Sequence, residues 1–350
     1  MKAIKISDRI IGKNRPPFIV AEMSGNHNHS LDRALKIVEA AAKAGCHGLK
    51  IQTYTADTMT LDCDRDEFWV NDDDSLWKGY SLHKLYQQAY TPWEWHEPIF
   101  NRCKELGIIG FSTPFDESAV DFLESLEPPM YKIASFENID LPLIEKAAAT
   151  GKPMIISTGM ATAAELDETV RTARKAGCDD LVLLRCTSSY PSTPEESNLL
   201  TIPHLESLFD VFVGLSDHTL GIGVALASIA LGATVIEKHF TLNRADGGVD
   251  SAFSMEPHEM EMLVCESMKA YQSLGKIHYG PTEKEKDSLQ YRRSLFAVAD
   301  IKKGEKFTRE NIRRIRPGHG LVPKYYTTII GKTASQDIKR GTPLRWELMG

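Results

Sequence analysis

The sequence lacks the segments that place a protein in or across a membrane. No run of about 18 apolar residues is present, so no membrane-spanning helix is predicted. The charged start, MKAIKISDRIIGKNRPP, has no apolar stretch of the kind found in secretion signals. There is also no basic block, and the net charge of -7 does not favour nucleic-acid binding. We therefore expect a soluble, cytoplasmic protein with no membrane or nucleic-acid partner.

The cysteines show no metal-binding or redox spacing. The chain has six of them, and no two form a CxxC motif. Several fall in predicted helices or strands, where a reduced cysteine packs like a small apolar residue. We interpret as reduced and structural Cys46, Cys63, Cys103, Cys178, Cys186 and Cys265.

Strand-like and helix-like segments alternate regularly from residue 18 onward. Eight segments have strand patterns, at residues 18–23, 48–53, 108–112, 131–134, 153–157, 181–186, 211–215 and 234–237. Helices fit between them, including residues 30–44 after a serine cap, 92–106 with proline in the first turn, and 162–176. This order predicts an α/β fold, a (β/α)8 TIM barrel. A doubly wound sheet is the alternative, but it gives no reason for polar residues after every strand.

The chain divides into a large and a small predicted domain. Residues 1–275 would form the barrel, ending with a helix at 257–274, and the polar stretch 276–290 is typical of a linker. Residues 291–350 contain two similar segments, DIKKGEKF (300–307) and DIKRGTPL (337–344). They predict a small β-rich domain, which buries little apolar surface alone and is expected to dock on another surface.

A long insertion follows the second predicted strand. Residues 56–91 include Trp69, Trp77, Tyr80 and an acidic patch at 71–74. Long loops on a barrel rim are often lids or specificity walls, although a solvated insertion is an alternative.

Two histidines stand at the centre of the pattern, in residues 214–240, GLSDHTLGIGVALASIALGATVIEKHF. His218 and His239 each come just past a predicted strand. If these strands are parallel neighbours, both imidazoles lie on one rim of the sheet. Two imidazoles can hold a metal that keeps open positions, whereas a structural zinc site needs four protein ligands. The alternative is two unrelated histidines, one capping a helix and one packed in a loop.

Two lysines lie in otherwise apolar strand contexts. Burying Lys50 or Lys132 without a partner is costly, so each needs an anion. Hydroxyl groups at the same predicted rim, with which the lysines could cradle a phosphate or carboxylate, belong to Thr113, Ser135, Ser157 and Ser216. Alternatively, the lysines pair with the carboxylates of Glu22, Glu137 or Glu237. Glu22 and Asp250 could also transfer protons or bind sugar hydroxyls.

Eight motifs resemble those of the sialic acid synthase family: AEMSGNHN (21–28), KIQTY (50–54), FSTPFD (111–116), YKIAS (131–135), ISTGMAT (156–162), GLSDHT (214–219), EKHFTL (237–242) and RPGHGL (316–321). They are colinear over nearly the whole chain, and the C-terminal domain resembles the antifreeze-like or SAF domain of those enzymes. AEMSGNHN, QTYTADTMTL and TPWEWH are most similar to the pseudaminic acid synthase branch. One departure is Ser188 in TSSYP, where neuraminate synthases carry asparagine.

The resemblance implies a transferase reaction. Phosphoenolpyruvate would condense with the open-chain aldehyde of an acetamido sugar, giving phosphate and a nine-carbon 2-keto acid by C–O cleavage. In the pseudaminic branch the sugar is 2,4-diacetamido-2,4,6-trideoxy-altrose. Ser188 puts a neuraminate product in doubt, although N-acetylneuraminate or legionaminic acid synthesis remains the alternative.

The resemblance also implies roles for individual residues. His218 and His239 would hold Mn²⁺, with Mg²⁺ or Co²⁺ possible, and would be catalytic together with Glu22 and Glu237. Residues implied at the phosphoenolpyruvate site are Lys50, Thr113, Lys132, Ser135, Ser157, Tyr190 and Ser216. Residues implied at the sugar site are Gln52, Glu137, Ser188, Asp250 and Arg316. Arg316 would reach the partner's active site in a domain-swapped homodimer.

Two other functions stay open at this point. A Schiff-base aldolase would use Lys50, Lys132 or Lys238. A sugar-binding protein would use the SAF-like domain to recognise a glycan.

Overall fold

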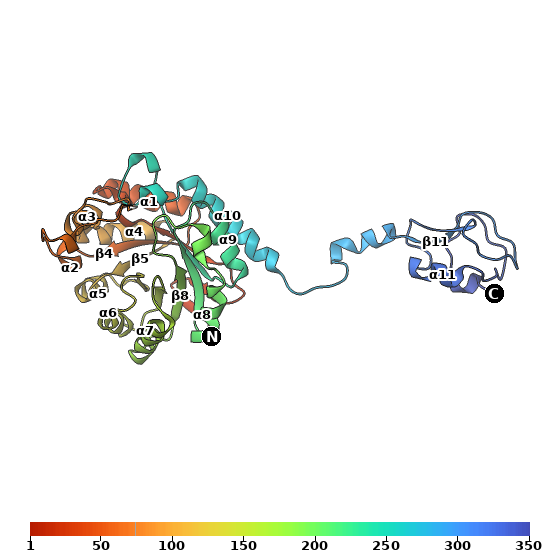
Figure 1. Ribbon diagram of the computed structural model, residues 1–350, viewed down its shortest axis with the longest axis horizontal. Coiled ribbons are helices and arrows are strands. Elements are labelled where there is room, and N and C mark those ends of the chain that lie inside the picture. Colours follow the sequence, from red (N-terminus) through yellow and green to blue (C-terminus); the bar gives the residue numbers. More distant parts are fainter. Residues whose placement is uncertain (74) are drawn as a thin grey trace. The chain divides into compact units, whose positions relative to one another are not determined.

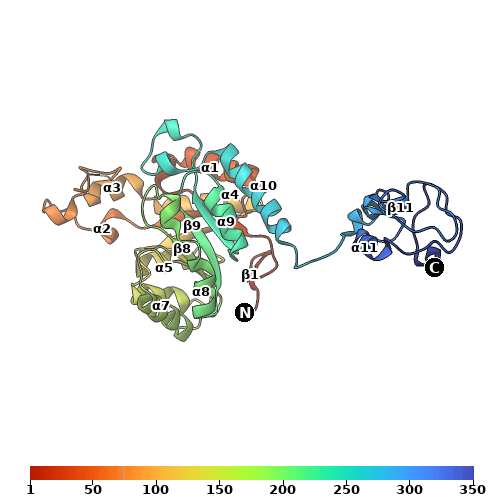
Figure 2. The ribbon, with the colours of Figure 1, turned by 45° about the vertical axis from the view of Figure 1, so that its right-hand side comes forward.

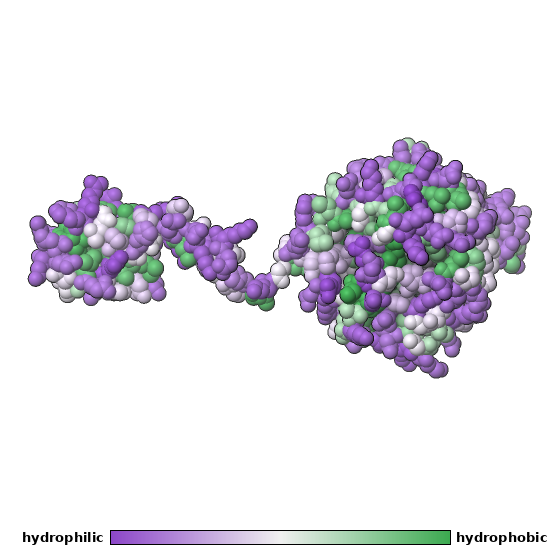
Figure 3. Space-filling view, turned by 180° about the vertical axis from the view of Figure 1, so that it is seen from behind, coloured by the Kyte–Doolittle hydropathy of each residue, from purple (hydrophilic) through white to green (hydrophobic). Residues whose placement is uncertain are grey.

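The computed structural model describes residues 1–73 and 75–350 (Figure 1). They form two compact units, Met1–Gly275 and Lys276–Gly350, which are described separately. No helix among these residues is both long and apolar enough to cross a membrane. On the face shown in Figure 3, apolar residues are scattered among hydrophilic ones.

The described part of the first unit contains a closed parallel barrel in the strand order β10-β3-β4-β5-β6-β7-β8-β9. Its strands are β3 (Phe18–Glu22), β4 (Gly48–Thr53), β5 (Ile109–Pro114), β6 (Tyr131–Ile133), β7 (Met154–Ser157), β8 (Leu181–Cys186), β9 (Phe212–Asp217) and β10 (Val235–His239). The predicted TIM barrel is confirmed, and the doubly wound alternative is wrong.

Helices surround the barrel (Figures 1 and 2): α1 (Leu31–Lys43), α4 (His96–Glu105), α5 (Glu117–Glu124), α6 (Leu141–Ala148), α7 (Ala163–Lys175), α8 (Thr201–Phe209), α9 (Gly223–Ala230) and α10 (Pro257–Leu274). Side-chain caps start several of them, as predicted. The Ser30 hydroxyl accepts from the amide of Arg33, and Thr162 forms a capping box with Glu165.

Several predicted boundaries need correction, and β5 continues through Pro114, two residues beyond its predicted end. β9 continues through Asp217 and β10 through His239, so His239 is the last residue of its strand and does not follow it. The helix predicted at 92–106 begins at His96, because Pro92 starts a separate 3-10 turn, η3 (Trp93–Trp95).

A short hairpin that the sequence pattern did not predict closes the N-terminal end of the barrel. β1 (Ile4–Ile6) pairs antiparallel with β2 (Arg9–Ile11). Ile4, Ile6 and Ile11 share an apolar core with residues from the beginnings and middles of the barrel strands, among them Phe18, Val20, Ile109, Val182, Phe212 and Val235. Because apolar side chains fill this end, the polar side chains of the barrel interior gather at the opposite, C-terminal end.

The insertion at 56–91 contains α2 (Ala56–Met59), η2 (Asp66–Phe68) and α3 (Leu82–Ala89). Figure 2 shows α2 and α3 at the left, beyond the ring of helices. The Trp77 indole N–H donates to the carbonyl of Val249, 2.8 Å away, and so holds the insertion against the loop that follows β10. In the predicted acidic patch, residues 71–73 are exposed, and residue 74 lies outside the described residues.

The second unit contains the turns η7 (Glu283–Glu285) and η8 (Asp287–Tyr291), the antiparallel pair β11 (Ser294–Ala297) and β12 (Ile312–Ile315), then η9 (Pro323–Tyr325), α11 (Tyr326–Ile329) and η10 (Trp346–Leu348). Its two similar segments face each other through an antiparallel bridge between Ile301 and Ile338. Asp300 accepts from the amide of Arg340, 2.8 Å away, and Asp337 accepts from the amide of Lys303, 2.9 Å away. The repeated sequence therefore forms a reciprocal pair around one small core.

Candidate active site

The C-terminal end of the barrel brings together charged side chains from neighbouring strands. In the strand register, Glu22 of β3 lies opposite Lys50 of β4 on one side and His239 of β10 on the other. Glu22, Lys50, Lys132 and Glu237 are each at most 5% exposed. Buried charges of both signs at this density require direct pairing, because each would be costly alone.

The two predicted lysines share the two carboxylates. The Lys50 ammonium lies 3.0 Å from Glu22 Oε2 and 3.5 Å from Glu237 Oε1, and it donates to the Thr113 hydroxyl at 3.0 Å. The Lys132 ammonium lies 3.8 Å from Glu237 Oε1 and donates to the Ser157 hydroxyl at 2.7 Å. The predicted carboxylate pairing is therefore present for Glu22 and Glu237.

Glu137 does not join that pairing. Its buried Oε2 has no hydrogen-bond partner among the described residues. Burial raises the pKa of Glu137 to about 7, which the charge of Lys132 only partly offsets. This carboxyl is therefore free to meet a ligand.

The two paired carboxyls differ in their acidity. Burial raises the pKa of Glu22 to about 7, although the neighbouring Lys50 opposes the shift. Burial acts in the same direction on Glu237, but Lys132 and Lys50 together hold its pKa below the usual value. Glu237 therefore stays ionised between the two lysines, while Glu22 can gain or lose a proton near neutral pH.

The two predicted histidines lie together, with ring centroids 5.3 Å apart. His218 Nδ1 lies 2.7 Å from the carbonyl of Thr187. Because a carbonyl only accepts, Nδ1 carries a proton. His239 Nδ1 is buried with no partner among the described residues, and burial holds the pKa of this imidazole well below its usual value. The His239 ring is therefore in the neutral form that binds metal. Burial would lower the pKa of His218, but hydrogen bonds to Cys186 and to the Thr187 carbonyl raise it, so metal binding at His218 would release a proton.

The chemistry of this pair fits a divalent cation with open positions. Among the described residues, no group of three or more His, Cys, Asp or Glu side chains forms a complete metal site. A cation held by the two imidazoles would take its remaining ligands from water or substrate oxygens, as a catalytic rather than structural site does.

Several other predicted residues join the network. Gln52 donates to Glu22 Oε1 at 3.1 Å, Ser188 donates to Ser135 at 2.8 Å, and the Ser216 hydroxyl lies 3.5 Å from Glu237 Oε1. The Asp250 carboxylate accepts from the Ser24 hydroxyl, and burial raises its pKa.

Two further residues are Asp116, which ends the FSTPFD motif, and Arg316, which is expected to act in the partner's site. Asp116 is not part of the network, because its carboxylate caps α5 by accepting from the amide of Ala119. Arg316 is exposed and belongs to the second unit, so its role stays a prediction.

Sequence reasoning missed Cys186. All six cysteines are free thiols, but Cys186 ends β8 beside His218. Burial would raise its pKa, yet a hydrogen bond from His218 and the charges of His218 and Lys132 lower it to about 7. Its position at a strand end, shared by the polar residues of the site, was the available signal.

Sequence reasoning also missed part of the aromatic surroundings of the histidines. The predicted Tyr190 has its ring 4.3 Å from that of His218. Phe253 lies 4.9 Å from His239, and Trp77 lies 6.0 Å from Tyr190, measured between ring centroids. These rings shield the imidazole pair from bulk water.

Comparison with known proteins identifies the family of this chain. Residues 37–279 match the model of the NeuB family, and residues 292–348 match that of the SAF domain. The chain belongs to the NeuB family. The resemblance to sialic acid synthases seen in the sequence is thereby confirmed.

Individual NeuB relatives are similar over most of their length. The pseudaminic acid synthase of Campylobacter jejuni is 44% identical over 94% of this chain and 95% of its own. The structure of the spore coat polysaccharide biosynthesis protein SpsE from Bacillus subtilis has 33% identity and a TM-score of 0.67, covering 100% of this chain and 99% of that one. The N-acetylneuraminic acid synthetase from Leptospira borgpetersenii, solved in complex with citrate, has 31% identity and a TM-score of 0.73, covering 83% and 96%.

A buried ion pair fixes the strands that carry the histidines. Lys238 and Asp217, each 1% exposed at the side chain, lie 2.8 Å apart. Lys238 also donates to the carbonyl of Thr219 at 2.7 Å, and Asp217 accepts from the Thr219 amide at 2.9 Å. Because Asp217 precedes His218 and Lys238 precedes His239, this pair ties together the two strand ends that set the spacing of the imidazoles.

We predict that Lys238→Met lowers the free energy of unfolding by about 3–5 kcal/mol, because it leaves the Asp217 carboxylate buried and unpaired. The double variant Asp217→Leu/Lys238→Met should recover much of this loss. Urea unfolding of the full chain measures both. Wild-type stability in the single variant would show that the pair is unimportant.

Proposed function

We propose that this protein condenses phosphoenolpyruvate with 2,4-diacetamido-2,4,6-trideoxy-altrose to give pseudaminic acid and phosphate. The observation that carries the proposal is the pair of buried lysines together with two adjacent imidazoles, in a chain 44% identical to a pseudaminic acid synthase. The lysines suit a phosphorylated acid, and the imidazoles suit the activation of a carbonyl group.

Phosphoenolpyruvate carries a phosphate and a carboxylate, so it needs several fixed positive and hydrogen-bonding groups. Lys50 and Lys132 supply the charge, and their hydroxyl partners Thr113 and Ser157 supply donors beside it. On binding, the substrate anion would take over the ammonium contacts that Glu22 and Glu237 now make. The positive groups are thus already in place before the reaction develops further charge.

His218 and His239 would hold a divalent cation, with Mn²⁺ expected and Mg²⁺ or Co²⁺ as alternatives. When bound, such a cation polarises the aldehyde oxygen of the sugar as a Lewis acid. His218 Nδ1 remains bonded to the Thr187 carbonyl, which keeps its ring in one orientation.

The reaction then forms one carbon–carbon bond and breaks one carbon–oxygen bond. C3 of phosphoenolpyruvate attacks the aldehyde carbon, whose oxygen takes up a proton and becomes a hydroxyl group. Water adds to C2 and loses a proton, and the tetrahedral product releases phosphate through C–O cleavage to leave the 2-keto group. We assign proton transfer to Glu22, because Gln52 still orients it after the substrate takes over the Lys50 contact, while Glu237 lies between both lysines.

The Schiff-base alternative is disfavoured at Lys50 and Lys238, whereas burial lowers the pKa of Lys132 and leaves it as the candidate lysine for that reaction. An aldolase lysine must be available as a neutral amine. Glu22 and Glu237 raise the pKa of Lys50 against the effect of burial, and Lys238 is bonded to Asp217. A second sugar remains a candidate, since the N,N'-diacetyllegionaminic acid synthase of Legionella pneumophila is 35% identical over 96% of this chain.

From the family resemblance we also propose a cytoplasmic, domain-swapped homodimer. In it, Arg316 of the SAF domain would contact the sugar bound to the partner subunit. Arg316 is exposed, as this role requires.

Phosphate release should identify the substrate. Phosphoenolpyruvate is offered with the diacetamido altrose sugar, with the diacetamido sugar for legionaminic acid, and with N-acetylmannosamine. We expect the fastest release with the altrose sugar, and an ¹⁸O label in the bridging position of phosphoenolpyruvate should leave with the phosphate. Reactions without sugar are the control. No phosphate with any of the sugars would overturn the proposed function.

Metal binding should depend on the two histidines. In His218→Ala and His239→Ala we expect turnover to be lost. Mn²⁺ affinity, measured by titration calorimetry, should fall by more than roughly 100-fold, because loss of a residue that only hydrogen-bonds to a metal ligand already costs roughly 10- to 100-fold. His204→Ala, which changes an exposed histidine of α8, should bind Mn²⁺ like the wild type. Wild-type affinity in the double variant would exclude this metal site.

A further inference from the structure

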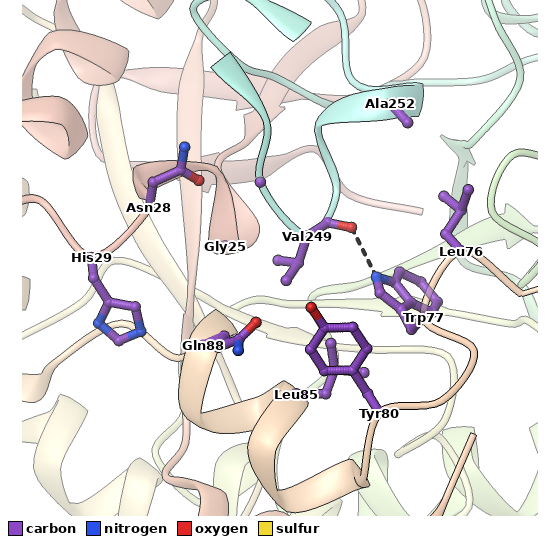
Figure 4. A pocket seen from close by; sticks show the side chains of 11 residues that line it. Gly25, Asn28, His29, Leu76, Trp77, Tyr80, Leu85, Gln88, Val249 and Ala252 are labelled. Atoms are coloured by element: carbon purple, nitrogen blue, oxygen red, sulfur yellow. Dashed lines mark hydrogen bonds between the residues drawn. The ribbon is translucent and has the colours of Figure 1, made fainter. Parts of the chain in front are cut away.

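A cavity of about 490 Å³ lies beside the candidate active site (Figure 4). Three segments line it: the turn after β3, the insertion with α3, and the loop that follows β10. The side chains used below are Asn28, Leu76, Tyr80, Leu85, Gln88 and Val249.

The wall of this cavity is continuous with the surroundings of the imidazole pair. Trp77 lines the cavity and donates to the Val249 carbonyl at 2.8 Å (Figure 4). Its ring centroid lies 6.0 Å from that of Tyr190, whose ring in turn lies 4.3 Å from that of His218. Val249 directly precedes Asp250, an expected sugar ligand. Trp77 and the loop that carries Val249 and Asp250 are therefore shared by the cavity and the candidate active site.

Glycine at position 25 makes this wall possible. A Cβ atom there would lie 2.4 Å from the Val249 side chain and 3.2 Å from the backbone of Ala89. The contact between the turn after β3 and the loop after β10 is thus too close for any larger residue.

The lining suits uncharged groups with methyl ends. Leu85 and Val249 form an apolar interior, while Leu76 and Tyr80, 49% and 42% exposed, stand at the rim. Asn28 and Gln88 add amide groups, and no Lys, Arg, Asp or Glu occurs among the described lining residues. Among the described lining residues, His29 alone can carry a positive charge, and its Nε2 lies 2.8 Å from the Gln87 carbonyl, so the cavity does not suit phosphoenolpyruvate as a second site.

We infer that this cavity receives the far end of the sugar, with its second acetamido group and its 6-deoxy methyl group, and thereby selects a diacetamido-trideoxy sugar over N-acetylmannosamine. The inference rests on the proposed function. Compared with N-acetylmannosamine, the trideoxy sugar has an acetamido group in place of one hydroxyl and a hydrogen in place of another, so that its C6 is a methyl group. Its additional methyl groups match the leucine, valine and tyrosine surface, and its additional amide can bond to Asn28 or Gln88.

Two variants test the cavity separately from the chemistry. Tyr80→Ala removes one wall, and Leu76→Trp fills space at the rim. Each should lower the ratio of kcat/KM for the diacetamido sugar to that for N-acetylmannosamine about tenfold, within the range that apolar pocket contacts provide. Leu61→Ala, at an exposed position of the same insertion that does not line the cavity, should keep the wild-type ratio. Because positions 76 and 80 are partly exposed, thermal unfolding should show that both variants fold.

The outcomes distinguish the two proposals. If the wild type condenses the diacetamido sugar but both variants keep the wild-type ratio of kcat/KM for the two sugars, the cavity does not select the sugar, and the proposed function stands. The cavity inference also fails if the wild type prefers N-acetylmannosamine. If the wild type releases no phosphate with either sugar, the proposed function itself fails.

Discussion

The rest of the candidate site depends on the pairing of the buried Lys50 ammonium with carboxylates. This ammonium is buried among Glu22, Glu237 and Thr113, and Glu237 links it to Lys132. Such a group of charges is stable inside a barrel only where each charge has a partner, so it dictates which residues can occupy four neighbouring or facing strands. The apolar core beneath the hairpin at the other end of the barrel permits this arrangement. It buries apolar surface, and so contributes the hydrophobic stabilisation that the polar end lacks. The same pairs that stabilise the ligand-free protein are contacts that an anionic substrate can replace.

Much of the fold could be predicted because barrel strands buried on both faces appear as apolar segments between helical ones. The errors have physical causes. Asp217 and Lys238 look like loop residues in sequence, yet their buried ion pair lets β9 and β10 continue through them. The first hairpin has strands of only three residues, too short for a periodic pattern to be evident. These features depend on partners that are distant in the chain.

The charged part of the site was predictable because lysine and glutamate in apolar strands are unusual in themselves. Phe253 carries no such signal, Cys186 is marked only by its place at a strand end, and Trp77 is marked only by its place in the long insertion. Their importance comes from lying beside His218, His239 and Tyr190, which the sequence alone does not show. Asp116 shows that a carboxylate after a strand can equally cap the next helix. The substrate followed from the family resemblance and not from spacing.

The central claim is that the imidazole pair and the two lysines form one site for a metal and phosphoenolpyruvate. A crystal structure with both bound, recorded at the manganese absorption edge, tests it most directly. The account predicts an anomalous peak within bonding distance of His218 and His239, with the phosphate of phosphoenolpyruvate against Lys50 and Lys132. Manganese bound away from both histidines, or phosphoenolpyruvate bound away from both lysines, would contradict it.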